Sequence, residues 1–142
     1  MLSVENREAV RLYWDKLLNE HDVAVGERIL APGFLLYDPL SPEPVGRETF
    51  LGMLRALFIS FPDIHYRAEE EFTEVSKVAI RWTMSATHKG SFMGVAPTGK
   101  KVTISGIDML YLVAGKIEAL RIEANVLSLA QQLGALPGLD LG

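Results

Sequence analysis

Two runs of strand-forming residues, joined by a glycine turn, constrain the fold of this chain more than any other feature. Residues 102–112 and 116–125 contain the β-branched, aromatic and aliphatic residues typical of strands. The dipeptide Ala114-Gly115 between them favours a two-residue turn, because glycine accepts a positive φ. The sequence therefore predicts a β-hairpin in the last third of the chain.

The turn also predicts which side chains share a face of this hairpin. With Val113 paired to Lys116, Asp108 lies opposite Arg121, and the two-residue period of a strand puts both on one face. A polar pair on an otherwise apolar face predicts either a buried Asp108–Arg121 ion pair or the floor of a ligand pocket. The same face is predicted to carry Val102, Ile104, Leu110, Leu112, Glu123 and Asn125.

Composition excludes several classes of function. The 142 residues predict one domain, 1–142, with a mobile tail from about residue 135. A net charge of −4 argues against nucleic acid and membrane surfaces as partners. The chain has no cysteine for disulfide or thiolate chemistry, and its three scattered histidines predict no metal site. No apolar run approaches about 18 residues, so we expect a soluble, cytoplasmic protein.

Helical periodicity dominates the first 60 residues, and strand periodicity dominates the rest. Apolar spacing predicts helices over 4–18 and 47–60, and Asp22 is placed to cap a shorter helix that runs to Leu30. Helices followed by hairpin-linked strands predict an α+β fold, with the helices on the concave face of a cone-shaped, curved antiparallel sheet and a cavity between them. Further strands are expected over 34–37, 64–72 and 77–88, and a short helix up to residue 133.

Residues 94–100 have the GxxxxGK spacing of a phosphate-binding loop. Such a loop opens a helix and is followed by Ser or Thr, whereas Lys101 and a predicted strand follow here. We therefore interpret this segment as a rigid loop between two strands.

Short blocks of residues, in order along the chain, carry a resemblance to a known family: Asp38-Pro39, Phe61-Pro62-Asp63, Thr87-His88-Lys89-Gly90, residues 94–100, Ser105-Gly106-Ile107-Asp108 and Gly115-Lys116-Ile117. In these blocks the chain resembles the SnoaL-like polyketide cyclases of the nuclear transport factor 2-like superfamily. The resemblance implies the cone-shaped α+β roll, also called cystatin-like. It also implies ring closure by intramolecular aldol chemistry without a metal or an organic cofactor.

Two positions depart from the pattern of that family. Its members usually have tryptophan at the place of Arg121 and a catalytic aspartate at the place of Asn125. An asparagine side chain binds a carbonyl or hydroxyl group but cannot ionise, so it cannot serve as the base. The resemblance therefore implies that any proton acceptor lies elsewhere in this chain.

A second resemblance suggests where the acceptor lies. Ketosteroid isomerases of the same superfamily have a similar Asp-Pro after the first short strand and a similar Ile-Asp in the long late strand. By this likeness Asp38 is the base and Asp108 donates to the oxyanion, as a carboxyl group kept neutral. Tyr13 lies near the place of the tyrosine donor of that enzyme, but its spacing to the segment Asn19-Glu20-His21-Asp22 differs by one residue from the spacing in that enzyme.

The candidate catalytic residues each have a structural alternative. Asp38 is the preferred base, and alternatively braces the turn before Pro39. His88 is a candidate proton shuttle or a hydrogen-bonded histidine at the rim. Asn125 is a candidate polar contact for the ligand or a helix cap. The candidate ligand-binding residues are Arg121, Tyr37, Trp14, Trp82, Phe58 and Met84, most of which alternatively belong to the core.

These observations predict a cofactor-free enzyme that removes a proton next to a carbonyl group of a small apolar substrate, in aldol cyclisation or isomerisation. The alternative is a non-catalytic module for binding a small ligand, or an interaction domain of the same fold. Ile107, Met109 and Tyr111 give the hairpin a second apolar face, which predicts a homodimer.

Overall fold

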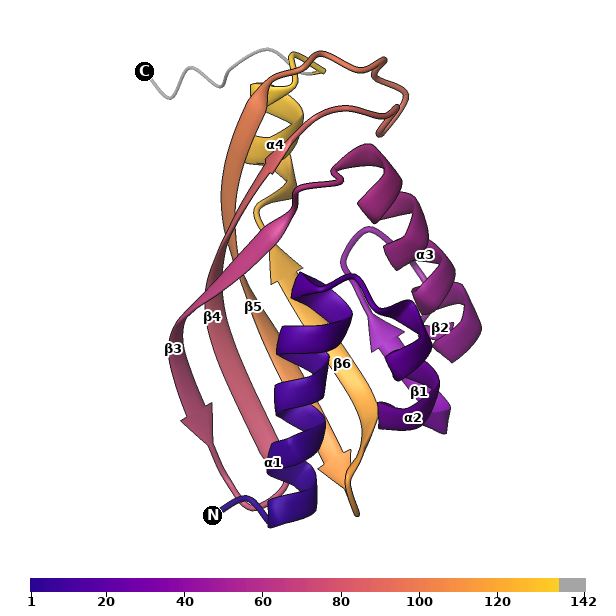
Figure 1. The fold of residues 1–142 in the computed structure, drawn as a ribbon, viewed down its shortest axis with the longest axis vertical. Coiled ribbons are helices and arrows are strands. Elements are labelled where there is room, and N and C mark those ends of the chain that lie inside the picture. The colour runs from indigo at the N-terminus through magenta and orange to yellow at the C-terminus, as the bar shows by residue number, and fades with distance from the viewer. Residues whose placement is uncertain (136–142) are drawn as a thin grey trace.

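A long curved sheet, with helices packed against one side of it, forms the body of the protein (Figure 1). The computed structural model describes residues 1–135, so most of the predicted mobile tail lies outside the described residues. The elements in chain order are α1 (Val4–Arg11), the π-helical segment η1 (Leu12–Asn19), the 3₁₀ turn η2 (Val23–Val25), α2 (Gly26–Ile29), β1 (Leu30–Tyr37), β2 (Val45–Gly46), α3 (Arg47–Ser60), β3 (His65–Thr73), β4 (Lys77–Thr87), β5 (Lys101–Val113), β6 (Lys116–Ala124) and α4 (Val126–Gln132).

The six strands form one sheet in the order β2-β1-β6-β5-β4-β3. The predicted α+β class with a curved sheet is confirmed. Neighbouring strands are antiparallel except for β1 and β6, which run parallel, so the sheet is mixed and not wholly antiparallel as predicted. The sheet continues past this parallel pair to β2, its edge strand, and α3 and the N-terminal helix lie on the same side of the sheet (Figure 1).

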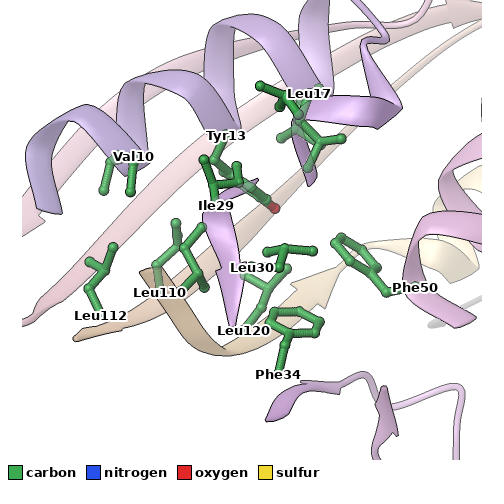
Figure 2. Packing of buried hydrophobic residues seen from close by; sticks show 14 of the residues in the cluster. Val10, Tyr13, Leu17, Ile29, Leu30, Phe34, Phe50, Leu110, Leu112 and Leu120 are labelled. Atoms are coloured by element: carbon green, nitrogen blue, oxygen red, sulfur yellow. The ribbon is translucent and has the colours of Figure 1, made fainter. Parts of the chain in front are cut away.

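The predicted N-terminal helix runs on as α1 and η1 without a break, but its second half is π-helical. The Ser3 hydroxyl caps its start by accepting a hydrogen bond from the Asn6 amide at 3.1 Å. Val10 and Tyr13 project from this helix toward Leu110 on β5 (Figure 2). A π-helical segment widens the helix and is frequent at functional sites.

The segment after this helix differs from its prediction. The short helix α2 ends at Ile29, and Asp22 makes no side-chain capping bond. Strand β1 begins at Leu30 and continues through Pro32 and Gly33, which were expected to end a helix and not to lie in a strand. The pairing of β1 with β6 is interrupted at these two residues, where the missing proline N–H breaks no ladder bond.

The hairpin has the predicted turn but not the predicted register. Ala114 and Gly115 both have a positive φ, 49° and 81°, and Val113 pairs with Lys116. Leu112 then pairs with Ile117, but the next residue, Tyr111, pairs with Ala119. Glu118 of β6 therefore has no partner on β5 and forms a bulge. This bulge moves every later residue of β6 to the face opposite the predicted one.

The predicted Asp108–Arg121 ion pair is therefore wrong. Asp108 pairs with Ile122 on the inner face of the sheet, whereas Arg121 points outward and its guanidinium lies 4.2 Å from the centre of the Tyr37 ring. The other polar residues that were expected beside Asp108, Glu123 and Asn125, are exposed.

The apolar core lies between the helices and the inner face of the sheet. Leu17 from the helix side and Leu110 and Leu120 from the sheet are fully buried (Figure 2). Burial of each such side chain contributes roughly 1.5–3 kcal/mol, which fixes the helix on the sheet. Within residues 1–135, no helix is long and apolar enough to cross a bilayer.

Candidate functional site

A cavity of about 480 Å³ lies between α3, η1 and the inner face of the sheet. Its wall is mostly apolar and comes from the helices, the strands and the loop 88–100. The lining residues are Tyr13, Leu18, Leu36, Asp38, Leu40, Phe50, Met53, Leu54, Ala56, Leu57, Ser60, Tyr66, Trp82, Met84, Ser91, Phe92, Met93, Ile104, Asp108, Ile122, Ala124, Val126 and Leu129. Two carboxylates and no lysine, arginine or histidine occur in this lining.

Asp108 lies in the cavity wall with both carboxylate oxygens hydrogen-bonded. Only 3% of its surface is exposed. The Tyr13 hydroxyl, from η1, donates to Oδ2 at 2.7 Å, and the Trp82 indole N–H, from β4, donates to Oδ1 at 2.9 Å. Two elements that are distant in the sequence, η1 and β4, therefore hold the carboxylate of a third, β5.

A glycine makes room for the indole donor. Gly106 lies opposite Trp82 in the pairing of β4 with β5, two residues before Asp108 on the same face. A Cβ atom at Gly106 would overlap the indole ring of Trp82 and would lie 2.8 Å from the Glu123 carbonyl oxygen, which is also too close. The Gly-Ile-Asp spacing thus lets Trp82 lie across the strand and reach the carboxylate.

Burial raises the pKa of Asp108 to about 6, while the hydrogen bonds from Tyr13 and Trp82 act in the opposite direction. Burial and the nearby Asp108 charge also hold the pKa of Tyr13 well above its usual value, so this phenol remains a donor. The predicted arginine partner is absent from this face, and the Asp108 carboxyl group exchanges a proton close to neutral pH. Such a carboxyl group suits general acid–base chemistry.

Asp38 lies at the edge of the same cavity, at the end of β1. Its Oδ1 accepts a hydrogen bond from the Leu40 amide at 2.9 Å, which braces the turn before α3. The carboxylate thus has the structural role that was considered for it and also belongs to the lining. Asp38 and Asp108 are the acidic residues of the cavity wall.

His88 and Asn125 lie outside the lining, where they stabilise neighbouring segments. His88 is fully buried, and its Nδ1 accepts a hydrogen bond from the Thr98 amide at 3.2 Å, which holds the loop 88–100 in place. That loop brings Phe92 to the cavity wall. The Asn125 side chain is exposed and caps α4 by accepting from the Ser128 amide at 3.2 Å.

The six candidate ligand-binding residues divide into three groups. Trp82 and Met84 line the cavity. Arg121 and Tyr37 instead line a separate open groove on the outer face of the sheet. Trp14 and Phe58 pack beside the cavity without lining it: the Trp14 ring meets Tyr66 edge-on at 6.0 Å, and the Phe58 ring stacks on His21 at 4.1 Å.

Sequence reasoning missed Tyr66 and the lining residues of α3 and the loop. Tyr66 on β3 lies two residues after the buried Ile64, which precedes the strand, and this alternation was the available signal. Its carbonyl and amide groups bond both ends of the Asn19 side-chain amide, at 3.0 and 2.8 Å. Among the described residues, no three His, Asp or Glu side chains are grouped as a metal site.

The family model for SnoaL-like polyketide cyclases matches residues 8–133. This chain belongs to that family. Among solved structures, it is similar to AclR from Streptomyces galilaeus, provisionally assigned as a hydroxylase: the TM-score is 0.85 at 28% identity, over 98% of this chain and 87% of AclR. No curated protein matched the sequence.

Two further structures share the fold. A protein from Jannaschia sp. CCS1, provisionally assigned as a SnoaL-like polyketide cyclase, has a TM-score of 0.84 at 24% identity over 94% of both chains. IdmH from Streptomyces antibioticus, provisionally assigned as a polyketide cyclase, has a TM-score of 0.79 at 23% identity, over 91% of this chain and 98% of IdmH.

Proposed function

We propose that the cavity binds a small, uncharged carbonyl compound and that Asp108 removes a proton from the carbon next to the carbonyl group. Membership of the SnoaL-like polyketide cyclase family supports this reaction class. The observation that carries the proposal is the Asp108 carboxylate in an apolar wall, held by Tyr13 and Trp82. The reaction is aldol cyclisation or isomerisation, carried out by side chains of this chain.

The pKa of Asp108 suits both directions of proton transfer. With a value of about 6, the carboxyl group is roughly 90% ionised at pH 7 and accepts a proton. The C–H bond breaks, its electrons form the enolate, and Asp108 becomes the neutral acid. In a cyclisation the enolate carbon bonds to a second carbonyl carbon of the same molecule, and the new alkoxide takes the proton from Asp108. In an isomerisation the proton returns to a different carbon.

The charge of the lining supports an uncharged substrate. Asp38 and Asp108 both disfavour an anionic ligand in this wall, and no cationic side chain of the lining offsets them. The apolar residues of α3 and of the loop 88–100 favour a substrate with a hydrophobic body and a carbonyl group at one end.

A ligand-binding role without catalysis is the second candidate. It is favoured by the hydrogen bonds at Asp108, because each of its oxygens already accepts one from the protein. Such bonds stabilise the carboxylate and weaken it as a base. A binding module would hold a ketone without exchanging its α-protons, so one exchange experiment distinguishes the two candidate functions.

The test is exchange of the α-protons of 1-tetralone and larger ketones in heavy water, followed by proton NMR. The proposal predicts exchange above the buffer rate with the wild-type protein and a loss of at least about 100-fold with Asp108→Asn. Asp38→Asn is the parallel variant, because Asp38 is the second carboxylate of the lining. Equal loss in both variants assigns both carboxylates to the step; loss with Asp38→Asn alone contradicts our assignment of the base. Ketone binding without exchange supports the binding module.

The proposal extends to assembly as a homodimer through the outer face of the sheet. Ile107 and Met109 each remain 41% exposed on that face, which supports a covering partner. Light scattering at micromolar concentration should give twice the chain mass, and the mass of a monomer would contradict this part of the proposal.

A further inference from the structure

We infer that Tyr66 is a catalytic residue whose hydroxyl group donates a hydrogen bond to the ligand carbonyl oxygen, and that it stabilises the oxyanion when the α-proton leaves. This inference rests on the proposed function of Asp108. It concerns the other half of the reaction, because an enolate needs a donor at its oxygen as well as a base at its carbon.

The position of Tyr66 is fixed from several sides. Its backbone is held by both ends of the Asn19 amide, at the last residue of η1. Its ring packs edge-on against Trp82 with centroids 5.1 Å apart, and edge-on against Trp14 at 6.0 Å. A side chain held in this way loses little conformational entropy when it binds a ligand.

The hydroxyl group of Tyr66 is free to serve a ligand. The Tyr13 hydroxyl and the Trp82 indole each donate to Asp108, so neither has a hydrogen left for a ligand. Tyr66 also lines the cavity, but its hydroxyl has no hydrogen-bond partner among the described residues. The Ser60 hydroxyl of the same lining donates to the Ser91 carbonyl at 2.7 Å.

Electrostatics keep this hydroxyl in its donor form. Burial raises the pKa of Tyr66, and the negative charge of Asp108 raises it further, so the phenol keeps its proton across the neutral range. Tyr66 and Asp108 also contact the same indole, Tyr66 through its ring at 5.1 Å and Asp108 through the Trp82 N–H at 2.9 Å, so the base and the donor lie at the same end of the cavity. A ketone whose oxygen meets Tyr66 therefore has its α-carbon on the side of Asp108.

The test uses 1-tetralone labelled with ¹³C at its carbonyl carbon, bound to the protein and observed by infrared spectroscopy. A hydrogen bond lowers the C=O stretching frequency, so we expect a lower frequency in the wild-type protein than in Tyr66→Phe. Tyr111→Phe is the matched control, because Tyr111 lies on the outer face of β5. The C=O frequency of the ketone bound to this variant should equal that in the wild-type protein. The exchange rate should fall about 100-fold with Tyr66→Phe.

Equal C=O frequencies in the wild type and Tyr66→Phe would overturn the inference. A wild-type C=O frequency equal to that of the ketone dissolved in a hydrocarbon would also overturn it, because the bound carbonyl would then accept no hydrogen bond. Asp108-dependent exchange together with equal frequencies defeats the role of Tyr66 alone. A frequency difference without exchange supports Tyr66 as a ligand donor and contradicts the proposed reaction. If the wild-type protein does not bind the ketone, both fail.

Discussion

Replacing Asp108 by asparagine should change how the stability of the protein depends on pH. The pKa of this carboxyl group is 3.8 without the protein environment and about 6 in the folded chain, because burial penalises its charge. At about 1.4 kcal/mol per pH unit, this difference corresponds to about 3 kcal/mol of folding free energy. The ionised carboxylate thus lowers stability at neutral pH, despite its two hydrogen bonds.

The sign follows from proton binding. Between about pH 4 and pH 6 the folded state holds the Asp108 proton and the unfolded state has lost it. The folded state binds more protons in this range, so the wild-type free energy of unfolding falls as the pH rises. Asparagine has no proton to lose, so the variant lacks this decrease.

The assay is urea unfolding of both proteins at one concentration, from pH 4 to pH 7.5, followed by tryptophan fluorescence. The difference in unfolding free energy, variant minus wild type, should increase by about 2 to 3 kcal/mol over that range, because a small part of the full effect is already present at pH 4. A constant offset from altered hydrogen bonds does not affect this increase. Parallel pH profiles, or a wild type that gains stability relative to the variant as the pH rises, would contradict the raised pKa of Asp108.

Three further predictions concern the surroundings of the site. Gly106→Ala should destabilise the fold by about 1–3 kcal/mol and shift Trp82 fluorescence, because the added methyl group meets the indole ring. The control is Gly52→Ala, at an open position of α3, which should stabilise the fold by up to about 1 kcal/mol in the same unfolding assay. Two hydrogen bonds from Thr87 lower the pKa of Asp63, so Asp63→Asn should destabilise the fold at pH 7. The effect should shrink as the pH falls below about 4, because protonation of Asp63 then removes the contribution of its carboxylate in the wild type. Arg121→Ala should leave ketone exchange unchanged, because Arg121 lies on the outer face; a large loss would contradict this placement.

The helices and strands were largely predictable from local patterns. The third helix was predicted over 47–60 and occupies Arg47–Ser60, since its apolar residues recur at the helical period. The hairpin turn was predicted because Gly115 accepts a positive φ. The start of β1 was missed because Pro32 and Gly33 usually end elements, and only the interruption in pairing with β6 lets them lie in a strand.

The register of β6 was missed although the sequence contained a signal. Ile117 and Leu120 are three residues apart and both fully buried, which a regular two-residue period does not allow. An extra residue at Glu118 restores the phase, and Ile122 then follows on the inner side. The turn alone fixed the pairing only for the two residue pairs before the bulge.

The candidate site was partly predictable for a similar reason. Asp108 was predicted on the inner face because period two along β5 suffices to place it there. Asn125 was placed on the inner face by the unshifted register and by the family pattern, yet in this chain it caps α4 outside the cavity. The donors to Asp108 come from η1 and β4, and local periodicity cannot show that Tyr13 and Trp82 meet the same carboxylate.

The role of Asp108 as the base can be tested by the pH profile of ketone α-proton exchange, measured for the wild-type protein and for Asp108→Asn. If Asp108 carries the proton, the wild-type rate should rise with pH as Asp108 loses its proton, with a midpoint at about pH 6 and a constant value above pH 7. The rate of the variant should be no higher than that of the buffer across this range. A wild-type profile without an inflection near pH 6, or an Asp108→Asn protein that exchanges at the wild-type rate, would contradict the claim that Asp108 carries the proton.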